Sequence, residues 1–262
     1  MKLTLLPLVP DVPLPVRASA SVRAVVPRGY GVQEQCLPFT AACALGLLVP
    51  APFDFGLCEE CDVPPQGRAF RPPDVACIPG DARVFYVIDH PASRFTGNAF
   101  DADPLPFVDE HGMHKEMRPV QPGISFMNRP DQAAHFKLHL PWVLKTPAGV
   151  DSLFVQPINR PAPLRLLTGL VETDWYAHPV NLVCDRPSTG SLHVRRGELI
   201  AQVFFVDRGS RRLSQELEPP DAAQAVEMKN ALREWFLAHA SDRSTYRRLA
   251  RSRHGQIDSD AG

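Results

Sequence analysis

The stretch that decides the fold runs from residue 166 to residue 206 and reads LLTGLVETDWYAHPVNLVCDRPSTGSLHVRRGELIAQVFFV. Its last part, residues 199–206, is rich in β-branched and aromatic residues and is apolar on both faces, which indicates a buried strand. Gly197 precedes this strand and supplies the positive φ that a tight turn requires. The segment therefore predicts a turn that leads into a buried strand.

Two carboxylates, Glu172 and Asp174, stand next to Trp175 in the middle of the same stretch. In an extended chain, residues two positions apart share one face and lie about 7 Å apart. A carboxylate there can act as a general base or accept a hydrogen bond from a sugar hydroxyl, and an indole beside it can stack on a ligand. The alternative is that Glu172 caps a turn and Trp175 packs in the core.

Two segments of the chain, GLVETDWYAHPVNLV and VRRGELIAQVFF, resemble the third motif and the final strand of the dUTPase and dCTP-deaminase (β-clip) fold. The resemblance covers residues 166–206. It implies that Glu172 matches the aspartate that orients the attacking water in dUTPases, and that Trp175 matches the aromatic residue that stacks on deoxyribose. The Pro-Arg-Ser-Ser phosphate motif and the glycine-rich C-terminal arm of that fold have no counterpart here. By analogy with this fold, a homo-oligomer is expected to be a trimer.

A second resemblance covers residues 30–206. The segments EQCLPFTAACALGLLVPAPFDF, FKLHLPWVLKTPAGVDSLFVQPINRP and LTGLVETDW are similar, in order and spacing, to a family of bacterial proteins of about this length. That family has no assigned function. The resemblance therefore implies a shared fold and a bacterial origin, and it transfers no catalytic residue.

The composition is that of an ordinary globular protein, with 44% hydrophobic and 22% charged residues. A formal net charge of −1 argues against bulk electrostatic binding to nucleic acid or to an anionic membrane. No run of 18 apolar residues is present, so no membrane-spanning helix is expected. The six cysteines are scattered, and the first residues do not read as a signal peptide, so we expect a reduced, cytoplasmic protein.

The 28 prolines are spread through the chain and favour short strands over long helices. We therefore expect a mainly β fold, either a distorted β-sandwich or a β-clip-like barrel. Strands at 135–144 and 152–157 are expected to form a hairpin across the turn between them. One internal helix is expected near residues 38–48, because Pro38 stands at its start and Gly46 stands near its end.

A C-terminal amphipathic helix is expected near residues 222–239, with Asp221 as its N-cap and its apolar face packed on the sheet. We expect one β-rich domain over residues 1–240 that contains a long polar loop at 91–122. Residues 241–262 are expected to form a basic and polar tail that is disordered at its end.

The main functional hypothesis is a small-molecule-binding β protein with an acidic and aromatic pocket, which leaves open whether it is an enzyme. Arg160, beside Asn159 at the end of a predicted strand, can supply a guanidinium for a carboxylate or phosphate, although it can equally hold a loop carboxylate. The residues expected to build this pocket, with catalysis assigned to the two acids, are Glu172, Asp174, Trp175, Arg160, Asn159 and Trp142.

Two further hypotheses remain open. On an extended strand, His135, Lys137 and His139 share one face, and two histidines with a carboxylate are the ligand set of non-haem iron oxygenases of jelly-roll type. Cys58 and Cys61 form a C-x₂-C pair that can supply half of a zinc site. Iron or zinc is therefore a candidate cofactor. The other hypothesis is a non-enzymatic interaction protein.

Overall fold

The computed structural model describes residues 1–8, 11–19, 37–59, 69–70, 85–88, 105–108, 111–117, 123–126, 134–187, 191–212, 219–242 and 248–249. The chain divides into two compact units, residues 1–212 and 213–262, and each is described by itself. The expectation of one domain that continues to residue 240 stays a prediction. Most of the expected tail at 241–262 lies outside the described residues.

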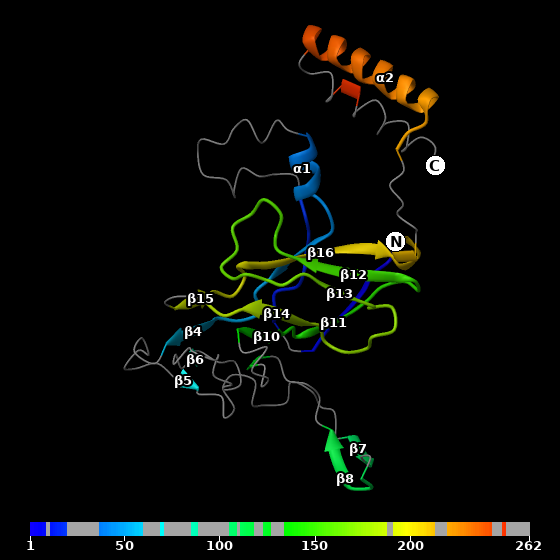
Figure 1. The fold of residues 1–262 in the computed structure, drawn as a ribbon. Helices are drawn as coiled ribbons and strands as arrows, with labels where there is room; N and C mark the ends of the chain where they lie inside the picture. Colours follow the sequence, from blue (N-terminus) through cyan, green and yellow to red (C-terminus); the bar gives the residue numbers. More distant parts are fainter. Residues whose placement is uncertain are drawn as a thin grey trace. The chain divides into compact units, whose positions relative to one another are not determined.

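Most of the regular elements in the first unit are strands, so the predicted mainly β fold is confirmed (Figure 1). Its elements are β1 (Thr4–Pro7), β2 (Val16–Arg17), α1 (Leu37–Cys43), β3 (Leu47–Pro50), β4 (Phe55–Glu59), β5 (Ala69–Phe70), β6 (Phe85–Ile88), β7 (Leu105–Val108), β8 (His114–Met117), β9 (Gly123–Phe126), β10 (His135–His139), β11 (Trp142–Lys145), β12 (Val150–Val155), β13 (Gly169–Val171), β14 (Asn181–Asp185), β15 (Leu192–Val194), β16 (Leu199–Asp207) and the 3-10 helix η5 (Arg208–Arg212).

The largest sheet has the strand order β13-β12-β16-β3-β2, with β16 in the middle. β16 is the strand that the sequence predicted from residues 199–206, and it runs antiparallel to both β12 and β3. Ile200, Ala201 and Val203 are completely buried, which explains why this segment is apolar on both faces.

A second sheet has the order β14-β10-β9, and all its pairs are antiparallel. The predicted hairpin between residues 135–144 and 152–157 is wrong. β10 pairs with β9 and β14, β11 pairs with β1, and β12 pairs with β13 and β16. Local turn chemistry did not decide these pairings, because each strand finds its partner through the apolar face that it shares with distant parts of the chain.

Four of the five sheets contribute to one apolar core, and β7–β8 contributes no described residue to it. The largest completely buried rings of the core belong to Phe136, Trp142 and Phe154, which come from β10, β11 and β12. A further sheet, β15-β4-β6-β5, contributes the buried residues Phe55 and Leu57 of β4. Among the described residues, no sheet closes on itself as a barrel.

The predicted internal helix at 38–48 is present but shorter, because α1 ends at Cys43 and β3 begins at Leu47. Gly46 makes the turn between them with a φ of +67°. The turn is fixed by Gln202 of β16, whose completely buried side chain donates to the Leu45 carbonyl at 2.6 Å. Leu47 and Leu48 therefore join the large sheet as part of β3, where they pair with Val203 and Gln202 of β16.

The second unit contains α2 (Ala222–Ser241), which confirms the predicted C-terminal helix. Asp221 is its N-cap, and it exchanges hydrogen bonds with Gln224 in a capping box. The packing of this helix on the sheet stays a prediction. The segment 91–122, expected to be a long loop, contains the antiparallel pair β7 and β8, and much of the rest lies outside the described residues.

Alanine substitutions at two glycines test how much the turn between α1 and β3 contributes to stability. A Cβ added to Gly46 would lie 1.9 Å from the Val203 carbonyl oxygen, whereas one added to Gly149 meets no atom within 4 Å. Both residues have positive φ, so Gly149→Ala carries the backbone cost alone, about 1–2 kcal/mol. We expect Gly46→Ala to lower the free energy of unfolding in urea by clearly more. Equal losses in the two variants would contradict this packing.

Candidate functional site

The residues Glu172, Thr173 and Asp174 lie in a turn after β13, where the sequence suggested an extended chain. The backbone N–H of Thr173 donates to the Val171 carbonyl, and that of Tyr176 donates to the Glu172 carbonyl. The turn brings both carboxylates to one guanidinium, that of Arg208, which directly follows β16.

Arg208 is shared by three carboxylates. Its Nε and Nη2 atoms lie 3.0 and 2.7 Å from Oδ1 of Asp151, whose side chain is completely buried. Nη2 also lies 2.5 Å from Oδ1 of Asp174, and Nε lies 3.8 Å from Oε1 of Glu172. A buried carboxylate needs such a partner, so Arg208 links β12 and β16 to the turn that carries the predicted acids.

Asp174 serves as a fixed anion of the turn. Its Oδ1 accepts from Arg208, and its Oδ2 accepts from the backbone N–H of Gly149 at 2.9 Å. These donors stabilise the ionised form and lower the pKa of Asp174 to about 2, with the Arg208 hydrogen bond as the largest cause. A carboxyl group with so low a pKa is a weak proton acceptor, so this geometry gives Asp174 a structural role.

Three buried hydroxyl groups form a hydrogen-bond network at the turn. Oγ1 of Thr173 lies 2.7 Å from Oγ of Ser152 in β12 and 3.0 Å from Oγ1 of Thr146. Thr146 in turn donates to the Val150 carbonyl at 2.5 Å. All three hydroxyl side chains are buried, and this network fixes the position of residue 173 between the two predicted acids.

Trp175 and Glu172 form the outward side of the turn. The Trp175 side chain is 65% exposed, although its Nε1–H donates to Oε2 of Glu172 at 2.6 Å. The ring of Tyr176 stands edge-on to the indole, with ring centroids 6.2 Å apart. The indole is therefore hydrogen-bonded along its N–H edge and contacts Tyr176, while much of its surface faces solvent.

The other residues predicted for the pocket have different surroundings. Nη2 of Arg160 donates to the carbonyls of Ser19 and Cys43, at 2.8 and 3.2 Å. Nδ2 of Asn159 donates to the Cys43 thiol, so both residues bind the region around α1. Trp142 is completely buried in the core. The structure thus brings together Glu172, Asp174 and Trp175, and it adds Arg208 where the sequence suggested Arg160.

The predicted metal ligands do not form a cluster within the described residues. Nδ1 of His135 lies 3.0 Å from Oδ1 of Asp185, and Nε2 of His139 lies 2.7 Å from the Ser125 hydroxyl. In the described part of the chain, no three His, Cys, Asp or Glu side chains converge as a metal site. Cys58 is buried in β4, and Cys61 lies outside the described residues. Iron and zinc therefore stay predictions.

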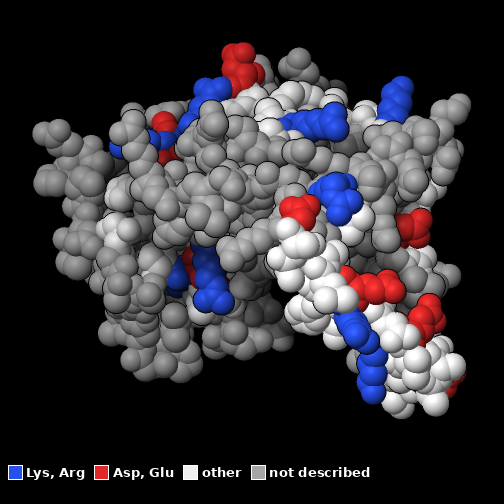
Figure 2. Space-filling view, turned by 90° about the horizontal axis from the view of Figure 1, so that it is seen from above, with Lys and Arg blue, Asp and Glu red and all other residues white. Residues whose placement is uncertain are grey.

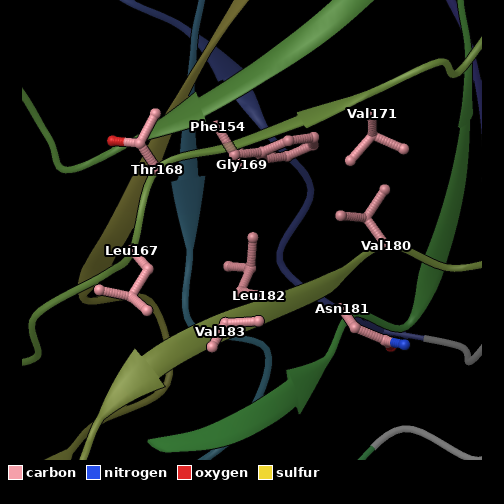
Figure 3. A pocket seen from close by; sticks show the side chains of 9 residues that line it. All are labelled: Phe154, Leu167, Thr168, Gly169, Val171, Val180, Asn181, Leu182 and Val183. Carbon is pink, nitrogen blue, oxygen red and sulfur yellow. The ribbon is translucent and has the colours of Figure 1, made fainter.

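An apolar cavity of about 230 Å³ lies between β13 and β14 (Figure 3). Its lining residues are Phe154, Leu167, Thr168, Gly169, Val171, Val180, Asn181, Leu182 and Val183. In the close view, the side chains of Phe154, Val171 and Val180 point toward one another across the cavity. The lining contains none of the site residues predicted from the sequence, although Val171 directly precedes Glu172.

The charged residues on the face shown in Figure 2 are mixed in sign. Lysine and arginine side chains are scattered among aspartate and glutamate side chains, and the coloured residues form no large patch of either charge. Within the described residues, no helix is long and apolar enough to cross a membrane.

Comparisons with protein-family models, with curated proteins and with solved structures find no match for this chain. The resemblances to the β-clip fold and to a bacterial family therefore stay expectations.

Sequence reasoning missed Arg208 and Asp151. A signal for Asp151 was present, because an acid inside the apolar strand VDSLFV requires a cation when the strand is buried. Arg208 follows the most recognisable strand of the chain, but nothing local indicates that it turns back toward residues 172–174.

The Asp174 ion pair predicts a dependence of stability on pH. The pKa of this carboxyl is lowered from 3.8 to about 2, so its stabilising effect is present above pH 3.8 and is lost as the pH falls toward 2. We expect Asp174→Asn to destabilise the protein at neutral pH, with the gap to wild type narrowing below about pH 4. Denaturant unfolding at several pH values measures this gap. A gap that stays constant down to pH 2 would exclude the ion pair as its cause.

Proposed function

We propose that the protein binds a small hydroxylated ring compound, a sugar or a nucleoside, on the surface formed by Trp175 and Glu172. The observation that carries this proposal is the exposed indole, held in place by a carboxylate that itself remains partly exposed. Sugars and nucleosides present a flat, weakly polar face for an indole and hydroxyl groups for a carboxylate.

The surrounding charge narrows the class of ligand. Three carboxylates and one guanidinium leave an excess of two negative charges around Arg208. The guanidinium is already bonded to Asp151 and Asp174, so it is a poor partner for a ligand phosphate. This environment favours a neutral or cationic ligand and disfavours a nucleotide. The sequence agrees, because it lacks the phosphate motif of the β-clip enzymes.

The β-clip resemblance supports the same two residues. It matches Trp175 to the aromatic that stacks on deoxyribose and Glu172 to the acid that meets the sugar. The structure adds a reason why binding is favoured over acid–base chemistry at the second acid, since Asp174 has both oxygens bonded and a pKa of about 2. Our proposal is therefore a binding site, with Glu172 as the acceptor for ligand hydroxyl groups.

Titration calorimetry with D-ribose, D-glucose, uridine and 2′-deoxyuridine tests the proposal. We expect at least one of these probes to bind the wild-type protein at millimolar concentration. Stacking on an aromatic ring contributes about 1–3 kcal/mol per base, so Trp175→Ala is expected to weaken nucleoside binding about five- to hundredfold. Trp175→Phe keeps a ring and is expected to lose less.

Glu172→Gln is expected to weaken binding by about tenfold or more, because a hydrogen bond to a charged group contributes about 1.5–3 kcal/mol. Phe236→Ala removes an exposed aromatic side chain of α2 and serves as the matched control, with unchanged affinity. The proposal is wrong if none of the probes binds, or if Trp175→Ala and Glu172→Gln bind as the wild-type protein does.

A further inference from the structure

The sheet β14-β10-β9 has one apolar face and one polar face. On β10, Phe136 and Leu138 are completely buried in the core, whereas His135, Lys137 and His139 alternate with them and are half-buried. The sequence predicted this shared face. The registers add Ser125 of β9 and Asn181 of β14 to the same polar face, because residues that are opposite one another in neighbouring strands point to the same side.

Ser125 and His139 form a hydroxyl–imidazole pair. The Ser125 Oγ atom lies 2.7 Å from Nε2 of His139, and both side chains are half-buried. This distance lies within the range for a nucleophile and its general base. Lys137 stands directly opposite Ser125 in the β9–β10 register, so the two side chains leave the sheet on the same face.

Asn181 stands directly opposite His139 in the β10–β14 register. Two backbone hydrogen bonds flank this pair of strands: the Leu140 N–H donates to the Val180 carbonyl, and the Arg186 N–H donates to the Ala134 carbonyl. Both bonds join even-numbered residues, so the even-numbered residues of β14 form the hydrogen-bonded pairs. His139 and Asn181 are therefore a non-hydrogen-bonded pair, in which Cα atoms lie about 4.5 Å apart and side chains are closest. The buried Oδ1 of Asn181 accepts no hydrogen bond among the described residues, and none from His139, so this acceptor is available to the imidazole beside it.

We propose that Ser125, His139 and Asn181 form a nucleophilic site that cleaves carboxylic esters. The serine is the nucleophile, the histidine is its general base, and the asparagine is a positioning residue that orients the imidazole. The same three roles occur in catalytic triads on unrelated folds. This site is independent of the Glu172 and Trp175 surface, so either proposal can fail alone.

The chemistry balances with water as the only co-reactant. The Ser125 Oγ atom attacks the ester carbonyl carbon while its proton passes to Nε2 of His139. The bond between the acyl carbon and the alcohol oxygen breaks, and the alcohol leaves with that proton. Water then attacks the acyl-serine and gives its proton to His139, which returns it to Oγ as the carboxylic acid departs.

The oxyanion of each tetrahedral intermediate requires hydrogen-bond donors or positive charge. Lys137, which lies opposite Ser125 on the same face of the sheet, is a candidate source of this positive charge. The backbone groups of the even-numbered residues of β10 hydrogen-bond to β14, so those of its odd-numbered residues face β9. Ser125 and Lys137 are therefore a hydrogen-bonded backbone pair. The register then directs the N–H of Phe126 away from β10, toward the outer edge of this sheet. A donor from the residue after the nucleophile serves the same purpose in α/β-hydrolases.

Covalent labelling of the wild-type protein is the test, because it does not depend on the folding of a variant. We expect a fluorophosphonate probe to add once, with mass spectrometry of the digested protein placing the adduct on Ser125. We also expect an initial burst of p-nitrophenol from p-nitrophenyl acetate. Ser125→Ala is expected to lose adduct and burst, and Ser191→Ala, which changes an exposed serine before β15, is expected to keep both.

The labelling rates of variants distinguish the role of His139 from that of Asn181. His139→Gln is expected to slow labelling by about 10²- to 10⁴-fold, the range for loss of a general base. Asn181→Ala is expected to slow it less, and Asn181→Asp to restore part of the loss, whereas a merely structural Asn181 would give equal rates in the two variants. An unlabelled Ser125 in the folded wild-type protein, or equal labelling of the Ser125→Ala variant, would overturn the proposal.

Discussion

The Arg208 guanidinium is the interaction on which the candidate surface depends. Asp151 is completely buried at the start of β12, and an unpaired buried carboxylate would carry a large desolvation cost. Arg208 meets that need from the end of β16 and, with the same guanidinium, holds Asp174 in the turn after β13. One cation thus joins the central strands of the large sheet to the segment that presents Trp175.

This arrangement divides the neighbouring acids by role. Asp151 and Asp174 are held by Arg208, whereas Glu172 lies farther from it and accepts the indole N–H. The buried hydroxyls of Thr146, Ser152 and Thr173 fix the turn between the acids. The indole of Trp175 is thus hydrogen-bonded within the turn. Under the function proposed above, an aromatic side chain that is oriented before binding lowers the entropic cost of binding.

The sequence predicted those features of the fold that depend on local sequence pattern. The strand at 199–206, the helix after Asp221 and the mainly β class follow from periodicity, capping and proline usage, and the structure confirms them. Strand pairing could not be predicted from local pattern, because the partners of β10 and β12 depend on a core to which residues from the whole unit contribute. The role of Arg208 and the Ser125–His139 pair were not predicted for the same reason. Arg208 is 34 residues from Asp174 in the sequence, and Ser125 is 14 residues from His139.

The role of Arg208 in holding the turn is tested most directly by the proton–nitrogen NMR spectrum of the three indole groups in wild type and Arg208→Lys. Lysine keeps the charge but cannot bond two carboxylates with one planar fork. We expect the Trp175 signal to move and broaden as its turn loosens, while the buried Trp142 signal stays in place and reports an intact core. An unchanged Trp175 signal beside an unchanged Trp142 signal would show that Arg208 does not hold the turn.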